Sequence, residues 1–106
     1  MPKYLFRASY AASGAAGVLK EGGTARQGAV TALVESLGGT VESMYWAFGP
    51  DDFFMIAELP DSAAVAAASL TVSSSGAVRV TTAELMSAGQ LDEAVKRRPT
   101  YRAPGA

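Results

Sequence analysis

Three charged residues are the strongest candidates for binding chemistry in this sequence: Arg7, Glu58 and Arg79. Each lies in a segment that is predicted to be a β-strand, at residues 3–10, 52–59 and 77–83. We expect them to share one face of a sheet, with Arg7 between Glu58 and Arg79. Two guanidinium groups would present forked donors that suit a carboxylate or a phosphate. An ion cluster with a structural or interface role is the alternative, because a buried charge must be paired.

A second candidate is the glycine turn between Lys20 and Arg26, which leads into the start of a helix. Free N–H groups and the helix dipole favour anions at such a position. The segment lacks the Gly-x-x-x-x-Gly-Lys-Ser/Thr spacing of a phosphate-binding loop, so nucleotide binding has little support. A plain turn between two helices is the alternative.

Three aromatic residues with polar tips, Tyr10, Tyr45 and Trp46, could hold a flat organic ligand between the sheet and its helices. Core or interface positions are the alternative. Asp51 and Asp52 are adjacent, so on a strand they would point to opposite faces and would not form an acid–base pair. We expect Asp52 to accept hydrogen bonds from backbone N–H groups of its own turn.

The composition excludes several function classes. The 106 residues include no cysteine and no histidine, which excludes disulfides, thiolate catalysis and the commonest metal ligands. We therefore expect no metal and no cofactor. The net charge of −1 gives no indication of a nucleic-acid or membrane partner. The charged N-terminal segment is unlike a signal peptide, so we expect a cytoplasmic protein.

Hydrophobic periodicity and turn residues predict the elements that would position these side chains. Thr24 is expected to cap a helix that ends at Gly38-Gly39, Asp61 or Ser62 caps the next, and Ser87 with Gln90 forms a capping box. Strands are predicted at 3–10, 40–48, 52–59 and 77–83, and helices at 11–20, 24–37, 63–73 and from 87 onward.

This order predicts an α+β fold of the ferredoxin-like type, β-α-β-β-α-β. Right-handed crossovers give a four-stranded antiparallel sheet in the order 4-1-3-2, with the helices on one face and a short C-terminal helix. We place a single domain at residues 1–95. Residues 96–106 form a basic tail containing Pro and Gly, either an arm for an anionic partner or a solvated end.

The strands predicted at 40–48 and 52–59 are apolar on both faces. A free monomer would expose a large apolar patch there. We therefore expect a homo-oligomer that associates through the open sheet face or through strand edges. The alternative is that the C-terminal helix folds back over this face.

Several stretches resemble the GYD-domain family of small bacterial proteins. The agreement covers about residues 1–86 and is carried by 1–10, 17–23, 34–39, 45–49, 56–61 and 75–80. In the turn that gives the family its name, Gly49 and Asp52 match, whereas Asp51 stands in place of the tyrosine. The resemblance implies an oligomeric ferredoxin-like fold and supplies no function.

Three functions are compatible with these residues. The leading hypothesis is an oligomeric protein that binds a small anionic ligand as a sensor or accessory factor. A cofactor-independent enzyme of the dimeric α+β barrel type would need a pocket lined by Tyr10, Tyr45 and Trp46, with Glu58 or Asp52 as the acid. A purely structural or assembly protein is the third.

Overall fold

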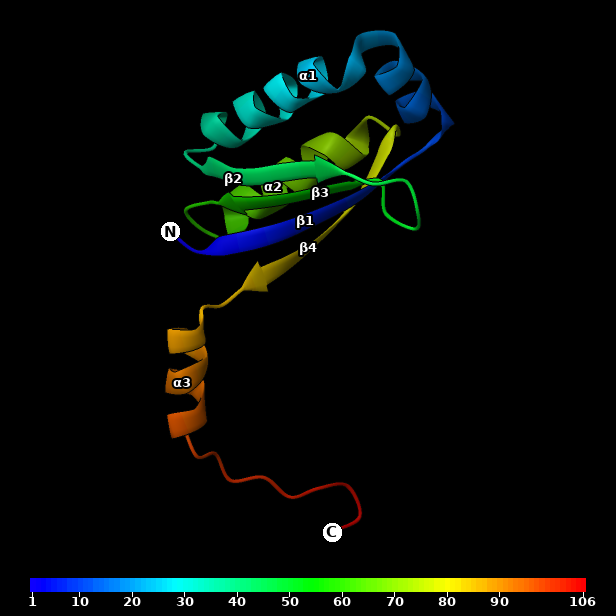
Figure 1. Cartoon of the computed structure of the whole chain (residues 1–106). Helices are drawn as coiled ribbons and strands as arrows, with labels where there is room; N and C mark the ends of the chain where they lie inside the picture. Colours follow the sequence, from blue (N-terminus) through cyan, green and yellow to red (C-terminus); the bar gives the residue numbers. More distant parts are fainter.

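A computed structural model describes residues 1–106 and confirms the predicted α+β architecture (Figure 1). The four strands form one antiparallel sheet in the order β2-β3-β1-β4, which is the predicted 4-1-3-2 order of a ferredoxin-like fold. The elements are β1 (Lys3–Tyr10), α1 (Ala12–Ser36), β2 (Thr40–Trp46), β3 (Phe53–Glu58), α2 (Ser62–Ser74), β4 (Val78–Leu85) and α3 (Ala88–Lys96).

The hydrophobic core lies between the sheet and helices α1 and α2. Alternation along the two central strands sends one set of side chains into this layer. Helix α1 contributes Val34 and α2 contributes Val65. The sheet contributes Tyr4, Phe6 and Ala8 from β1 and Phe53, Met55 and Ala57 from β3. The opposite face of the sheet is covered by neither helix.

Helix α1 consists of two helical segments separated at Gly22. The backbone of Gly22 has φ 81° and ψ 172°, a conformation that glycine adopts without the steric penalty of a Cβ atom. The predicted break between two helical pieces is therefore confirmed. The prediction that Thr24 caps the second piece was wrong, because the chain leaves and re-enters helical geometry at Gly22, two residues earlier.

The end of α1 is a close packing point. Gly38 has φ 81°, its N–H donates to Glu35, and the Gly39 N–H donates to Val34, the pattern of a Schellman motif. A Cβ atom on Gly39 would lie 2.4 Å from the carbonyl oxygen of Glu58 and 2.6 Å from Leu59 Cδ2. The predicted glycine stop is confirmed, and it brings α1 directly against the end of β3.

The two remaining helices begin at the predicted caps. The Asp61 carboxylate accepts a 2.9 Å hydrogen bond from the Ala64 N–H at the start of α2. Ser87 and Gln90 form the reciprocal capping box at the start of α3. Both helix starts are thus fixed by local side chains.

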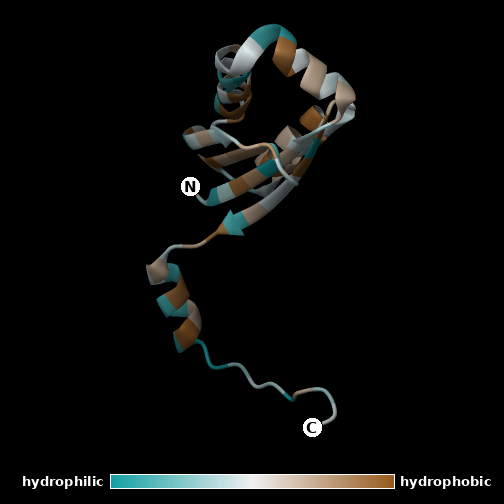
Figure 2. Cartoon of the chain, turned by 45° about the vertical axis from the view of Figure 1, so that its right-hand side comes forward, coloured by the Kyte–Doolittle hydropathy of each residue, from teal (hydrophilic) through white to brown (hydrophobic).

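Helix α3 and the tail project away from the sheet (Figure 1). The chain measures 55 × 33 × 22 Å with a radius of gyration of 16.9 Å, whereas a compact chain of this length has about 13 Å. Apolar and polar stretches both appear on α3 in Figure 2, and none of its residues is buried. No helix of the chain combines the length and apolar character that crossing a membrane requires.

Candidate functional site

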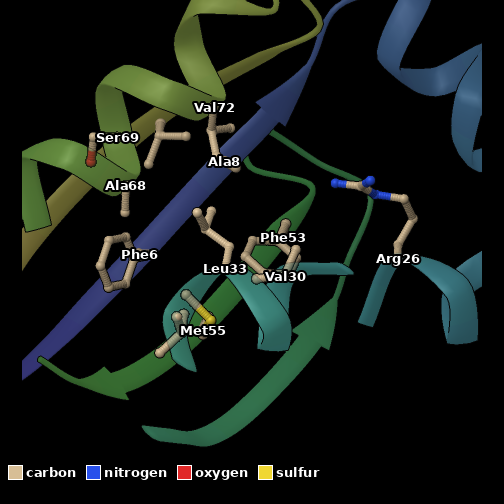
Figure 3. Close-up of a pocket in the computed structure, with 12 residues that line it drawn as sticks. Phe6, Ala8, Arg26, Val30, Leu33, Phe53, Met55, Ala68, Ser69 and Val72 are labelled. Atoms are coloured by element: carbon tan, nitrogen blue, oxygen red, sulfur yellow. The ribbon is translucent and has the colours of Figure 1, made fainter. Parts of the chain in front are cut away.

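An apolar cavity of about 60 Å³ lies between α1 and α2, over the centre of the sheet (Figure 3). Phe6, Ala8, Phe53 and Met55 form its floor, because they are the helix-facing residues of β1 and β3. Its walls are Val30, Leu33 and Val34 from α1 and Ala68, Ser69 and Val72 from α2. A volume of this size has room for about four water-sized spheres, or a short aliphatic segment.

A more polar cleft of about 310 Å³ adjoins this cavity. Arg26 and Val72 line both spaces, so the two lie side by side at these side chains. The cleft lies between the first half of α1 and the start of β4, and is lined by Tyr10, Ser13, Gly14, Gly17, Val18, Glu21, Ser75, Ala77 and Val78. We call the cavity and the cleft together the helix–sheet cleft.

Arg26 is the only basic residue that lines the helix–sheet cleft. It is half-buried, and its Nη1 atom donates one long hydrogen bond of 3.3 Å to Glu21 Oε1. A guanidinium carries five N–H donors, so most of the donors of Arg26 have no protein acceptor. In Figure 3 the Arg26 guanidinium lies at one side of the apolar cavity, with its nitrogens on the side that faces the other labelled residues.

Ser69 provides a second polar group on the opposite side of the same cavity (Figure 3). Its Oγ atom is buried and has no hydrogen-bond partner within the protein. A buried hydroxyl without a partner is destabilising by about 1–3 kcal/mol. The cavity therefore offers a free hydroxyl on one side of its apolar floor and a partly free guanidinium on the other.

Tyr10 and Trp46 are brought together beside the cleft, as the aromatic hypothesis requires. The Trp46 Nε1–H donates a 2.9 Å hydrogen bond to the Tyr10 hydroxyl, and the Trp46 ring contacts Phe53 edge-on at 5.3 Å. The Asp52 carboxylate accepts a 2.9 Å bond from the Tyr10 backbone N–H. Asp52 thus binds a strand 42 residues away in sequence, and the prediction that it serves its own turn was wrong.

The three charged candidates on the strands, Arg7, Glu58 and Arg79, lie on the open face of the sheet, on the side away from the cleft. Arg7 and Arg79 are diagonal neighbours there, because Arg7 pairs with Thr81 and Arg79 pairs with Ser9. Glu58 pairs with Lys3, four residues from Arg7 along β1, which is about 13 Å. The strand order places Arg7 between the other two as expected, but the register separates Glu58 from both arginines, and no ion pair joins them.

Tyr45 also lies on the open face, opposite Phe54, and its side chain is exposed. The residues proposed for an enzyme pocket are therefore divided: Tyr10 and Trp46 lie on the helix side, and Tyr45 and Glu58 lie on the other. Lys20 is exposed and does not line the cleft. Of the two basic residues of the glycine turn, Lys20 and Arg26, Arg26 alone lines the cleft.

The two shifted pKa values lie outside the cleft. Burial raises the pKa of the Tyr4 hydroxyl above 10.0, and the nearby Glu84 carboxylate raises it further. A hydrogen bond to Glu42 raises the pKa of Lys3 above 10.5, and the Glu42 charge acts in the same direction. Neither group is poised to transfer protons near neutral pH.

Sequence reasoning did not identify Ser69 or the cavity walls. Ser69 is one of several serines in an Ala-rich helix, and only the packing of α2 against the sheet shows that this hydroxyl is buried. Val30 and Leu33 belong to the apolar stripe that correctly predicted α1. The stripe indicated a core-facing helix, and its periodicity could not show that α1 and α2 leave a space between them.

These features define a ferredoxin-like α+β protein with a cleft between its two covering helices and its sheet. The chain belongs to the GYD domain family, whose model matches residues 4–95. No curated protein and no solved structure matches it. Membership agrees with the family suggested by the sequence resemblance and leaves the ligand to be inferred from the cleft itself.

Proposed function

We propose that this protein binds a small organic anion with an apolar body in the helix–sheet cleft, as a sensor or accessory factor. The observation that carries the proposal is Arg26, a half-buried guanidinium at the junction of an apolar cavity and a polar cleft. A carboxylate on Arg26 would use donors that the protein leaves free. The attached apolar group would extend over Phe53 and Met55 and replace water there.

Ser69 supports the same orientation of the ligand, with its anionic group at Arg26 and its apolar end in the inner cavity. A ligand that carries a hydroxyl or carbonyl group at its apolar end would satisfy the buried Ser69 Oγ. The volume of about 60 Å³ in the inner cavity limits this end to a few non-hydrogen atoms, while the outer cleft of about 310 Å³ accommodates the remainder.

Binding is favoured over catalysis by the state of the polar groups at the site. The Tyr10 hydroxyl already accepts a hydrogen bond from Trp46, and the Asp52 carboxylate is engaged by the Tyr10 backbone. These contacts hold the end of β1 in place and explain both side chains without a reaction. A cytoplasmic location remains a prediction from the charged N-terminal segment.

Calorimetric titration with hexanoate and with 1-hexanol tests this proposal, because the two probes differ chiefly in the anionic group. We expect hexanoate to bind more tightly than hexanol, and Arg26→Gln to weaken hexanoate binding about tenfold or more without changing hexanol binding. Lys20→Gln is the matched control, since Lys20 is a nearby basic residue outside the cleft. Equal affinities for both probes, or an equal loss of affinity in Lys20→Gln, would contradict the proposal, because Arg26 would then not bind the anionic group.

A further inference from the structure

The open face of the sheet carries an apolar surface that no element of the chain covers. Register places Leu5 beside Ile56 and Ala83 in one row across the sheet, and Tyr45 beside Phe54 in the next. Leu5, Phe54 and Ile56 are half-buried by their neighbours in the sheet, and Tyr45 is 71% exposed. A contiguous apolar surface of this kind typically marks an interaction site.

Helix α3 carries a second apolar surface without a partner. Ala88, Leu91 and Val95 recur at positions i, i+3 and i+7 and so form one stripe along the helix. Leu91 and Val95 are 53% and 59% exposed. Asp92 borders this stripe, because consecutive helical residues are about 100° apart. A helix with this pattern ordinarily packs its stripe against another element.

Unpaired charges of opposite sign lie on the open face and beside the α3 stripe. Arg7 lies beside Phe54 in the second of these rows, Arg79 is its diagonal neighbour on β4, and neither forms an ion pair within the chain. Asp92 is also unpaired, whereas Glu93 is already bound to Lys96 on the same helix at 3.4 Å. The sheet face thus presents free cations where α3 would bring a free carboxylate.

We infer that α3 of one copy of this chain docks on the open sheet face of a second copy, so that two copies exchange their C-terminal helices. The stripe of Leu91 and Val95 would cover Leu5, Phe54 and Ile56, with Asp92 toward the two arginines. Both surfaces occur on every copy, so a two-fold dimer in which each copy receives the α3 of the other would cover both surfaces and close the assembly.

The connection between β4 and α3 favours a second copy over the chain's own sheet. Only Met86 and Ser87 separate the two elements, and the capping box fixes the direction in which α3 starts. That direction leads away from the sheet (Figure 1). The start of α3 and the open face border one hollow of about 570 Å³, lined by Lys3, Glu42, Ile56, Leu85 and Gln90 among others, so the chain itself leaves this space unfilled.

Disulfide cross-linking between differently labelled copies tests this inference directly, because the natural chain has no cysteine. One full-length chain carries Leu91→Cys and the other carries Ile56→Cys, and the two are mixed and oxidised. We expect a mixed disulfide dimer of the two labels. Leu19→Cys is the control partner, because Leu19 is 89% exposed on α1, away from the open face.

Absence of the mixed disulfide would overturn the inference. A chain carrying both cysteines distinguishes the reason: an internal disulfide in a monomer would show that α3 folds back on its own sheet. Equal cross-linking of Leu91→Cys to Leu19→Cys would show random collision, and would overturn the inference as well.

Charge reversal gives an independent measurement in solution. By sedimentation, we expect Arg7→Glu and Asp92→Arg each to weaken dimerisation about tenfold or more. The two together should restore most of the association, because the charges are again opposite. Both substitutions are at exposed positions, so folding should be retained and is checked by circular dichroism. A wild-type chain that stays monomeric at about 100 μM, or a dimer indifferent to both reversals, would contradict the inference.

Discussion

The Trp46 indole N–H donates a 2.9 Å hydrogen bond to the Tyr10 hydroxyl, joining the end of the edge strand β2 to the end of the central strand β1. The bond crosses β3, which lies between these strands. Tyr10 also lines the polar cleft, so this contact fixes one wall of the candidate site.

Trp46→Phe removes this bond and leaves an aromatic ring in place. We expect the free energy of unfolding to fall by about 1 kcal/mol from the lost hydrogen bond, with a further loss from the smaller ring. Urea unfolding measures this loss of stability. Tyr10→Phe removes the acceptor of the same hydrogen bond. In a double-mutant cycle the two effects should be less than additive; full additivity would show that the bond contributes nothing.

Gly39→Ala should destabilise the protein by about 2 kcal/mol or more, because the added Cβ would overlap the Glu58 carbonyl and Leu59. Gly28→Ala is the matched control within α1, where a Cβ atom meets nothing within 4 Å. It should stabilise the protein by about 0.5–1 kcal/mol through helix propensity. Thermal unfolding of both variants checks this contrast, and similar effects for the two would contradict the close packing at Gly39.

Asp61→Ala removes the side chain that caps α2 and should lower the free energy of unfolding by about 1 kcal/mol. Ser62→Ala, one residue later, is a suitable control because Ser62 makes no side-chain hydrogen bond. Chemical unfolding compares the two variants. Equal losses would show that the carboxylate of Asp61 does not cap the helix.

Stability should decline as the pH rises above about 10. Both Tyr4 and Lys3 have folded-state pKa values raised above their ordinary values of 10.0 and 10.5. The folded protein therefore holds these protons more tightly than the unfolded chain, so the stabilisation is complete below pH 10 and is lost on further titration. Urea midpoints between pH 8 and 11 measure the decline, and Tyr4→Phe should make it shallower. A urea midpoint that rises over this pH range would contradict the raised pKa values of Tyr4 and Lys3.

Local signals in the sequence predicted the fold well. The Ser87 and Gln90 capping box, the glycine stop at Gly38 and the alternation of β1 all depend on residues close in sequence, and the structure confirms each. The strand order followed from right-handed crossovers, which do not depend on the exact strand ends.

The position of Glu58 relative to Arg7 could not be predicted in the same way. Strand order determines which strands are neighbours, whereas register determines which residues lie level, and register depends on the geometry of distant connections. Asp52 illustrates the difficulty, because its carboxylate and its N–H both bind β1 and so help to set how β3 lies beside it.

The cleft and the path of α3 also required the structure. The spacing between α1 and α2 depends on how each helix packs on the sheet, and periodicity only shows which face of a helix is apolar. For α3 the stripe of Leu91 and Val95 predicted a helix with an apolar side, but the same stripe is compatible with docking on its own sheet or on another copy.

A methyl NMR titration of the full-length protein with hexanoate tests the proposed binding site most directly. Binding in the helix–sheet cleft should shift the methyl signals of Val30, Leu33 and Val72 in a saturable way, and Arg26→Gln should abolish most of that shift at the same ligand concentration. Shifts confined to Leu5 and Ile56 on the open face, or no saturable shift at any methyl group, would contradict binding in the cleft.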